Sequence, residues 1–136
     1  VFGNNEKNKY SMSSPIYKFI FQAIKHKKIQ IFDNSHKYKR DFIYVGDVCK
    51  IHYKMLSKDV SGIFNVGRGK ALSFQVIANA IAKKYSAKIY YIKMPGDLKK
   101  HYQKFTKADI KKIKKIITIR FVDPISYIKK LKKIYI

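Results

Sequence analysis

The apolar residues of this chain change their spacing several times, and this restricts the possible fold more than any other feature. Over 13–27 they recur every three or four residues, as on a helix with one buried face. Short β-branched and aromatic runs at 29–32 and 89–92 instead have the composition of strands. Because helical and strand-like segments alternate along the chain, the sequence predicts an α/β fold.

Small polar residues mark where the expected helices begin. The Ser-Ser-Pro at 13–15 suits the cap and first turn of the first helix, and Ser73 suits the cap of a helix over 74–85. A further helix is expected over 46–56, where Asp47 could act as its cap because carboxylates are favoured at helix N-termini. The inner stripe of that helix is expected to comprise Val48, Ile51, His52, Met55 and Leu56.

Shorter segments complete the expected order of elements. They are an extended segment at 40–45, a buried parallel strand at 62–67, a turn at 95–97, a helix over 107–115 capped by Thr106, and a last helix from Pro124 towards Lys133. Three or four short strands leave sheet edges that need partners. We therefore expect residues 1–136 to form a single incomplete unit, which has no internal repeat and no Gly/Ser linker.

The start of the sequence reads as internal to a longer chain. It opens on Val1 rather than Met, and 1–5 lack the pattern of a signal or transit peptide. No run approaches the roughly eighteen apolar residues that a membrane-spanning helix needs, so no contact with a membrane is expected. One cysteine cannot form an internal disulfide, and the reducing cytoplasm is the expected compartment.

The formal net charge of +23 first suggests a nucleic acid as partner, although a hydrophobic content of 46% excludes a disordered basic tail. Only Arg40, Arg68 and Arg120 are arginine, whereas phosphate and base recognition favours that planar side chain. Lysine, isoleucine and asparagine share codons rich in A and T, so a nucleotide bias explains the charge without a charged partner. The basic runs at 25–28, 111–115 and 129–133 are interpreted as solvated helix faces.

The histidines and the cysteine lack the spacing of known reactive or metal-binding motifs, so no metal site is expected. Cys49 is interpreted as a packed, unreactive thiol. Gly67–Lys70 superficially resembles a phosphate loop, but Walker A and dinucleotide spacings are both absent, which favours a turn after a strand. Arg40 could clamp a phosphate or could pair with Asp41 or Asp47, and the local sequence leaves both open.

Two motifs make the chain recognisable. The stretch Arg40–Val48, followed by Gly62–Gly67, resembles the second half of the extended short-chain dehydrogenases/reductases that act on nucleotide-sugars. Other stretches narrow the resemblance to the ADP-L-glycero-D-manno-heptose 6-epimerases, and it extends over nearly the whole chain. These stretches are Lys9–Ser14, Ile31–Ser35, Tyr38–Arg40 and His101–Asp109.

The resemblance implies the C-terminal, substrate-binding part of such an enzyme, without most of the N-terminal Rossmann domain. Family members interconvert ADP-D-glycero- and ADP-L-glycero-D-manno-heptose, for the lipopolysaccharide core, by oxidising and reducing C6 with NADP. The glycine fingerprint and the Tyr-x-x-x-Lys pair are not in these residues. This chain alone is therefore expected to be inactive, with its partner either the missing half or further copies. The alternatives are another nucleotide-sugar epimerase or dehydratase, or a basic nucleic-acid-binding module.

The same resemblance implies roles for individual residues. Lys9 matches a catalytic lysine that acts as acid or base and also contacts the cofactor, and Val1 aligns beside the nicotinamide. Arg40 matches the arginine that pairs with the diphosphate. Lys18 stands where the family commonly has a histidine, and Asn34 replaces a usual glycine. The expected substrate-binding residues are Ser11, Lys18, Phe32, Asp33, Asn34, Ser35, Arg40 and Tyr102.

Overall fold

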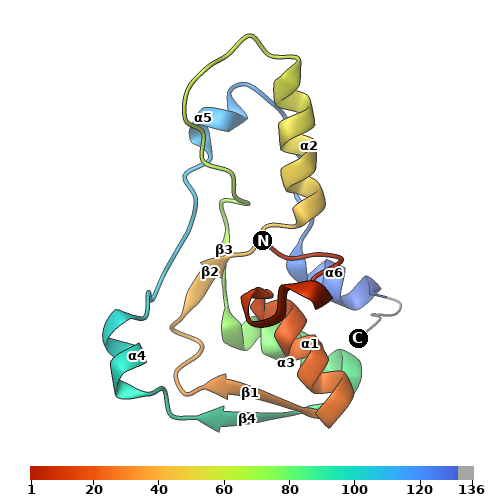
Figure 1. Ribbon diagram of the computed structural model, residues 1–136, viewed down its shortest axis with the longest axis vertical. Coiled ribbons are helices and arrows are strands. Elements are labelled where there is room, and N and C mark those ends of the chain that lie inside the picture. The colour runs from red at the N-terminus through yellow and green to blue at the C-terminus, as the bar shows by residue number, and fades with distance from the viewer. Residues whose placement is uncertain (132–136) are drawn as a thin grey trace.

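The structure, a computed structural model, describes residues 1–131 and has the predicted α/β character (Figure 1). In chain order its elements are η1 (Lys7–Met12), α1 (Pro15–His26), β1 (Lys28–Phe32), β2 (Lys39–Asp41), α2 (Val45–Leu56), β3 (Ala71–Ser73), α3 (Phe74–Tyr85), β4 (Lys88–Ile92), α4 (Gly96–His101), α5 (Lys111–Lys114) and α6 (Pro124–Lys130). Within this described part, no helix is long and apolar enough to cross a membrane.

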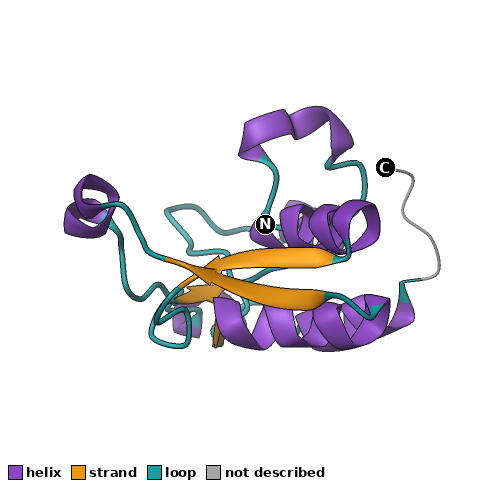
Figure 2. Cartoon of the chain, turned by 90° about the horizontal axis from the view of Figure 1, so that it is seen from below, coloured by secondary structure: helices purple, strands orange, loops and turns teal. Residues whose placement is uncertain are grey.

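The described strands form two separate two-stranded sheets. β1 and β4 are parallel, in a register that pairs Lys28 with Lys88 and Phe32 with Ile92. β2 and β3 are antiparallel, and Arg40 pairs with Leu72. Helices lie on both sides of the β1–β4 pair (Figure 2), and four of the five β4 residues are exposed, so this strand lies at an edge of the fold.

The helix starts predicted from the sequence are confirmed for three helices. The Ser14 and Ser73 hydroxyls accept N–H bonds from the first turns of α1 and α3, and Asp123 caps α6, which begins at Pro124. The other ends of α1 and α3 are left-handed, at Lys27 (φ 53°) and Ser86 (φ 52°). Glycine is the usual residue at such helix ends, because other residues are strained there. The expected continuation of the last helix to Lys133 lies outside the described residues.

Two apolar clusters hold the fold together. The larger one joins α1, β1, α3 and α6, and its side chains include Ile16, Ile20, Ile29, Ile77, Ile81 and Ile128. The smaller one joins α2 to the segment around α5, through Ile43, Ile51, Ile110, Ile113 and Ile117. Figure 1 shows these two regions at opposite ends of the long axis, with β2 and β3 between them.

The prediction of a buried strand at 62–67 is wrong. Ile63 is 89% exposed, and the polar contacts of the segment come from side chains: Lys112 Nζ donates to the Ile63 carbonyl and Asn65 Nδ2 to the Asp109 carbonyl. A parallel strand needs a neighbouring strand to bond its backbone groups. Within residues 1–131, no strand pairs with this segment.

Two short helices differ from their predictions. The turn expected at 95–97 instead begins α4, whose first turn closes with an N–H bond from Lys99 to the Pro95 carbonyl. The helix expected over 107–115 is reduced to α5, with Ile110 rather than Thr106 at its N-cap. Thr106 is instead drawn into contact with β2, where its N–H donates to the Lys39 carbonyl, so a tertiary contact overrides the local helical pattern.

The details predicted for α2 are only partly correct. Tyr44 occupies the N-cap without a side-chain bond, whereas Asp47 is fully buried and accepts from the Val122 N–H at 2.6 Å. Leu56 is 84% exposed and His52 is exposed, so neither belongs to the buried stripe. Cys49 is also exposed, which contradicts the prediction of a packed thiol.

Candidate functional site

A pocket of about 240 Å³ opens where the parallel strands β1 and β4 end. Phe32 and Ile92 are the last residues of these strands, and both line it. Ligands of open α/β folds bind outside the carboxyl ends of parallel strands, so this pocket is the first candidate for a binding site. Its lining consists of Pro15, Lys18, Phe19, Gln30, Ile31, Phe32, Ser35, Tyr38, Phe74, Ile92 and Tyr102.

Tyr102 lies at the centre of an aromatic group in this pocket. Its ring packs edge-on against Tyr38, with centroids 5.1 Å apart, and against Phe32 at 6.2 Å. Phe74, at the start of α3, is 6.5 Å away. Burial raises the pKa of the Tyr102 phenol, and the nearby charge of Arg40 offsets this only in part. The phenol therefore stays protonated and can donate a hydrogen bond.

Arg40 on β2 stacks on the same aromatic group. Its guanidinium carbon is 5.2 Å from the Tyr102 ring centroid and 5.5 Å from that of Phe74. Its Nη1 donates to the Lys39 carbonyl. Neither ion pair considered from the sequence forms among the described residues, because Asp41 and Asp47 bond to backbone N–H groups elsewhere. The stack leaves a planar cation at the edge of an apolar pocket.

The turn after β1 accommodates the asparagine that stands where the resemblance implies a glycine. Asn34 has φ 58°, in the left-handed region that glycine and asparagine adopt most readily. The turn is held by N–H bonds from Asp33 to the Ile92 carbonyl and from Ser35 to the Phe32 carbonyl. The buried Ser35 hydroxyl donates to Gln75 Oε1 at 2.8 Å, which joins the turn to α3.

Lys18 connects the pocket to the segment before α1. Its Nζ donates to the Ser11 carbonyl at 2.6 Å, so Ser11 and Lys18 are brought together. Lys18 and Gln30 also line a second, adjoining groove of about 870 Å³. The other residues along this groove are Lys7, Ser13, Tyr17, Phe21, Gln22, His26 and Lys28.

The remaining two predicted site residues lie apart from this pocket. Lys9 is exposed on η1, and Val1 is 63% exposed. Neither is among the residues that line the pocket. A buried carboxylate that the sequence analysis missed, Glu6, fixes this segment by accepting the Gly3 and Ser14 N–H groups and the Ser14 hydroxyl. The structure thus orders the start of the chain without joining Lys9 to the pocket.

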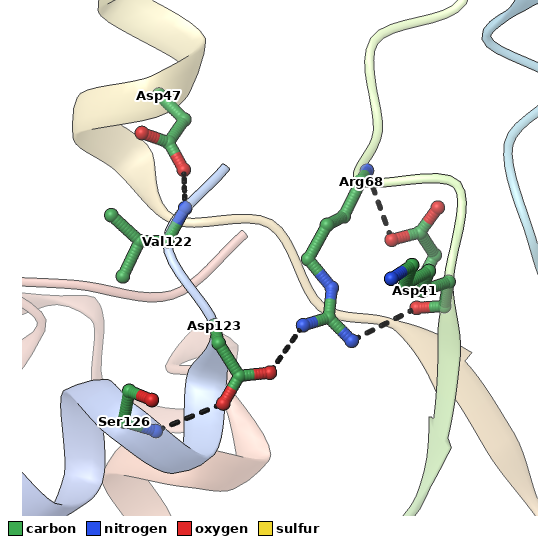
Figure 3. A network of polar contacts seen from close by, with 7 residues as sticks. Asp41, Asp47, Arg68, Val122, Asp123 and Ser126 are labelled. Carbon is green, nitrogen blue, oxygen red and sulfur yellow. Dashed lines mark hydrogen bonds and ion pairs between the residues drawn. The ribbon is translucent and has the colours of Figure 1, made fainter. Parts of the chain in front are cut away.

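The loop at Gly67–Lys70 does not offer a cradle for the phosphates of a dinucleotide. In the loop at Gly67–Lys70, the Arg68 N–H donates to the Asp41 carboxylate at 3.0 Å (Figure 3), and the Gly69 N–H donates to it at 2.8 Å. A Cβ at Gly67 would come within 2.4 Å of the Ala108 Cβ, so the loop is already filled. An internal carboxylate therefore occupies the place that a phosphate would take in a phosphate loop.

The sequence analysis missed several residues that shape the pocket region. Tyr38 and Phe74 were assigned only to flanking segments, although both line the pocket. Asp41 and Arg68 were not recognised as partners across the fold. The sequence does contain two signals: Asp41 directly follows Arg40, and Arg68 lies between two glycines. Neither signal shows that Asp41 binds the backbone at Arg68, because that contact depends on the fold.

Comparison with known proteins places this geometry in context. Residues 1–67 match the model of the NAD dependent epimerase/dehydratase family. The ADP-L-glycero-D-manno-heptose-6-epimerase of Helicobacter pylori is 25% identical with a TM-score of 0.75, over 94% of this chain and 40% of that one. The UDP-N-acetylglucosamine 4-epimerase of Methanobrevibacter ruminantium, in complex with UDP-N-acetylmuramic acid, is 24% identical with a TM-score of 0.75, over 95% of this chain and 41% of that one.

A third similar structure is that of an enzyme with a different reaction. It is an NAD-dependent NDP-hexosamine 5,6-dehydratase of tunicamycin biosynthesis, 15% identical with a TM-score of 0.72, over 86% of this chain and 39% of that one. The chain thus spans about two fifths of the length of the solved structures that it resembles. The predicted fold class is confirmed: the chain has the fold of part of an extended short-chain dehydrogenase/reductase of the epimerase and dehydratase type.

Proposed function

We propose that this chain is the substrate-binding part of a cytoplasmic nucleotide-sugar epimerase whose substrate is ADP-glycero-manno-heptose, inverted at C6. The observation that carries the proposal is the convergence of Lys18, Phe32, Ser35 and Tyr102 on one pocket, with Arg40 stacked on the ring of Tyr102. Phe32, Ser35, Arg40 and Tyr102 keep the residue types that the resemblance implies for the substrate site, and Lys18 stands where a histidine is common. Their surroundings also suit a nucleoside diphosphate, which needs an apolar slot beside a planar cation.

The division of the site supports this substrate class. The aromatic pocket is small and apolar, as a nucleoside requires, whereas the adjoining groove is larger and carries lysine, histidine, glutamine and serine side chains. Lys18 lies at the boundary between the two spaces. We assign the pocket to the nucleotide and the groove to the sugar, with Lys18 donating to a phosphate or hydroxyl oxygen in place of the family's histidine.

Inversion at a carbon without an acidic proton requires transient oxidation, which a nicotinamide dinucleotide supplies when bound. Because Asp41 already binds the backbone of the loop at Gly67–Lys70, we assign its binding to the remainder of the enzyme, and we propose NADP from the family resemblance. Lys9 and Val1 are proposed to meet the cofactor only in that assembly, and Lys9 to move a proton at the sugar. The exposed position of both residues supports this assignment.

The proposed partner is the remainder of such an enzyme. Large apolar side chains are exposed at the end of α2 and in the segment after it, at Tyr53, Leu56, Val60 and Ile63. A cluster of this kind marks a surface that packs against another protein surface. The chain spans about two fifths of its structural neighbours, so we propose that the rest of the epimerase covers this face.

The first alternative function keeps the fold and changes the sugar. The Methanobrevibacter 4-epimerase matches this chain as well as the heptose epimerase does, which favours a UDP-hexose as the competing substrate. Nucleic-acid binding has less support, because Figure 1 places the basic residues of α5 and those at the end of α1 at opposite ends of the molecule. They do not form one stripe along a single surface.

Calorimetric titration of the chain with ADP-heptose, ADP and UDP-N-acetylglucosamine separates these proposals. We expect ADP and ADP-heptose to bind and UDP-N-acetylglucosamine to bind at least about tenfold more weakly. The reverse preference would favour the hexose enzyme, and no binding of any of the three would contradict the proposed function. Co-expression with the N-terminal half of the Helicobacter pylori epimerase should then restore C6 inversion, and Lys9→Ala should abolish it.

A further inference from the structure

The Asp41 carboxylate joins three backbone segments that are distant in sequence. It accepts the N–H groups of Arg68 at 3.0 Å, Gly69 at 2.8 Å and Ala108 at 3.1 Å. Hydrogen bonds to an ionised carboxylate are stronger than those between neutral groups. Asp41 therefore ties β2 to the loop before β3 and to the segment that leads from Tyr102 towards α5.

The loop around Gly67 and Gly69 can approach the Asp41 carboxylate closely because it lacks side chains there. A Cβ at Gly67 would lie 2.9 Å from Asp41 Oδ2, and Gly69 has φ +73°, so both glycines are needed for the loop to approach. The Arg68 side chain, which is 8% exposed, leads away from Asp41 and bonds Asp123 at 2.7 Å. Burial acts to raise the pKa of the Asp123 carboxyl, but the Ser126 N–H and Arg68 bonds outweigh it and lower the pKa (Figure 3).

Asp41 is adjacent to Arg40 on β2, and successive side chains of a strand point to opposite faces. On one face Arg40 stacks on Tyr102, and on the other face Asp41 binds the loops. The segment after Tyr102 runs beside β2, with N–H bonds from Lys39 to the Lys104 carbonyl and from Thr106 to the Lys39 carbonyl. The bond from Ala108 to Asp41 fastens the far end of this segment.

We propose that Asp41 is a positioning residue, which sets the stacked pair of Arg40 and Tyr102 by fixing the segment 102–108 against β2. This inference rests on the proposed function, because the pair is assigned to the anionic part of the nucleotide. Asp41 does not touch the ligand itself. It acts through the register of the segment that carries Tyr102, and a loss of its charge loosens that segment while Arg40 and Tyr102 both remain.

The test compares Asp41→Asn with Asp109→Asn in the whole chain. Asp109 is an exposed carboxylate that also accepts a backbone N–H, from Lys111, so its replacement removes the same charge at a position that does not join β2 to the loops. We expect Asp41→Asn to weaken ADP binding about tenfold or more, since misplacement of a binding group by an ångström has effects of this order, and Asp109→Asn to leave it unchanged. Asp41→Glu, which keeps the charge but moves the carboxylate, should weaken binding in the same way.

Two further measurements separate positioning from loss of fold. In ligand-free protein, stacking on two rings should shift the Arg40 Nε–H proton upfield, and Asp41→Asn should remove this shift. Ile51→Val, in the distant cluster around α2, provides a destabilised control whose ADP affinity should stay that of the wild type. An Arg40 signal that keeps its upfield shift in Asp41→Asn, or an ADP affinity that equals that of the wild type, would overturn the inference. Failure of the wild type to bind ADP would instead contradict the proposed function.

Discussion

At the scale of single residues, the chain uses its scarce arginines differently from its abundant lysines. Arg40 stacks on two aromatic rings and Arg68 is buried against Asp123, whereas the lysines of the basic runs within residues 1–131 lie at the surface. Lys132 and Lys133, which complete the last run, lie outside the described residues. A planar guanidinium can stack flat on a ring while it donates hydrogen bonds, whereas a lysine ammonium contacts a ring only as a point charge. Arg40 and Arg68 are therefore the arginines whose planar geometry is used within the fold.

Arg40→Lys tests this difference directly. The substitution keeps the positive charge but removes the planar stack on Phe74 and Tyr102, so we expect ADP affinity to fall about tenfold. Arg120→Lys, at an exposed arginine outside the pocket, is the matched control and should bind ADP as the wild type does. Titration calorimetry gives both values. Equal affinities for the two variants would show that only the charge at Arg40 is used.

Tyr127 gives a prediction about alkaline stability. Burial, followed by the nearby Tyr44 and Glu6, raises the pKa of its phenol from 10.0 to about 12. A pKa that is higher in the folded protein contributes stability below the unfolded value, and this stability is lost as the pH rises through the folded value. Between pH 10 and 12 the wild type should thus lose more stability than Tyr127→Phe.

Urea unfolding at several alkaline pH values measures this loss. Tyr53→Phe is the control, because the Tyr53 ring is 78% exposed, and its unfolding midpoint should follow that of the wild type. Parallel pH dependence in the wild type and Tyr127→Phe would contradict the prediction.

At the scale of elements, the sequence predicts best where cap and periodicity agree. Helices α1 and α3 combine a serine cap with a regular apolar stripe, and both form where expected. The segment 62–67 has an equally apolar composition but forms no strand, because a strand depends on a neighbour that the local sequence does not encode. The 107–115 segment fails for a related reason: its first residues are bound to β2 and Asp41.

The pocket shows the same limit. Family resemblance pointed to Lys18, Phe32, Ser35 and Tyr102, which the fold brings together, but composition and spacing alone could not have selected them. The Asp41 carboxylate accepts N–H bonds from residues that lie 27, 28 and 67 positions away in the sequence, so no local pattern could predict these bonds.

The turn after β1 yields a prediction at this scale. Asn34→Ala should lower the free energy of unfolding by about 1 kcal/mol, because alanine is strained in the left-handed conformation, whereas Asn34→Gly should retain or raise it. Chemical denaturation of the two variants measures the difference. If both variants unfold at the wild-type midpoint, the turn does not impose this conformation in solution.

At the scale of the whole molecule, the apolar side chains fall into a buried set that stabilises the fold and an exposed set that we assign to assembly. The two clusters in the interior maintain the fold, while Leu56 and Ile63 are 84% and 89% exposed. Side chains this exposed contribute little to the stability of the isolated chain. Their contribution is therefore expected to appear only when the proposed remainder of the enzyme is present.

The double substitution Leu56→Glu with Ile63→Glu tests that expectation. The thermal midpoint of the chain alone should not fall, but epimerase activity restored by the added N-terminal half should fall at least about tenfold, because charges would be buried in the interface. The control carries the same change at two exposed apolar positions elsewhere, Val76→Glu and Leu98→Glu. Equal activity of the two double variants would exclude this face as the interface.

The left-handed ends of α1 and α3 are occupied by residues other than glycine, which agrees with a nucleotide bias against glycine codons. Glycine codons are rich in G, and the chain has only 6 glycines. It places Lys27 and Ser86 at positive φ, where residues other than glycine, asparagine and aspartate are strained by about 1–2 kcal/mol each. Gly3 and Gly67 remain where a Cβ would meet a neighbouring atom at 2.4 Å. Gly3 and Gly67 thus stand where a side chain has no space, whereas Lys27 and Ser86 stand where the backbone torsion angle favours glycine.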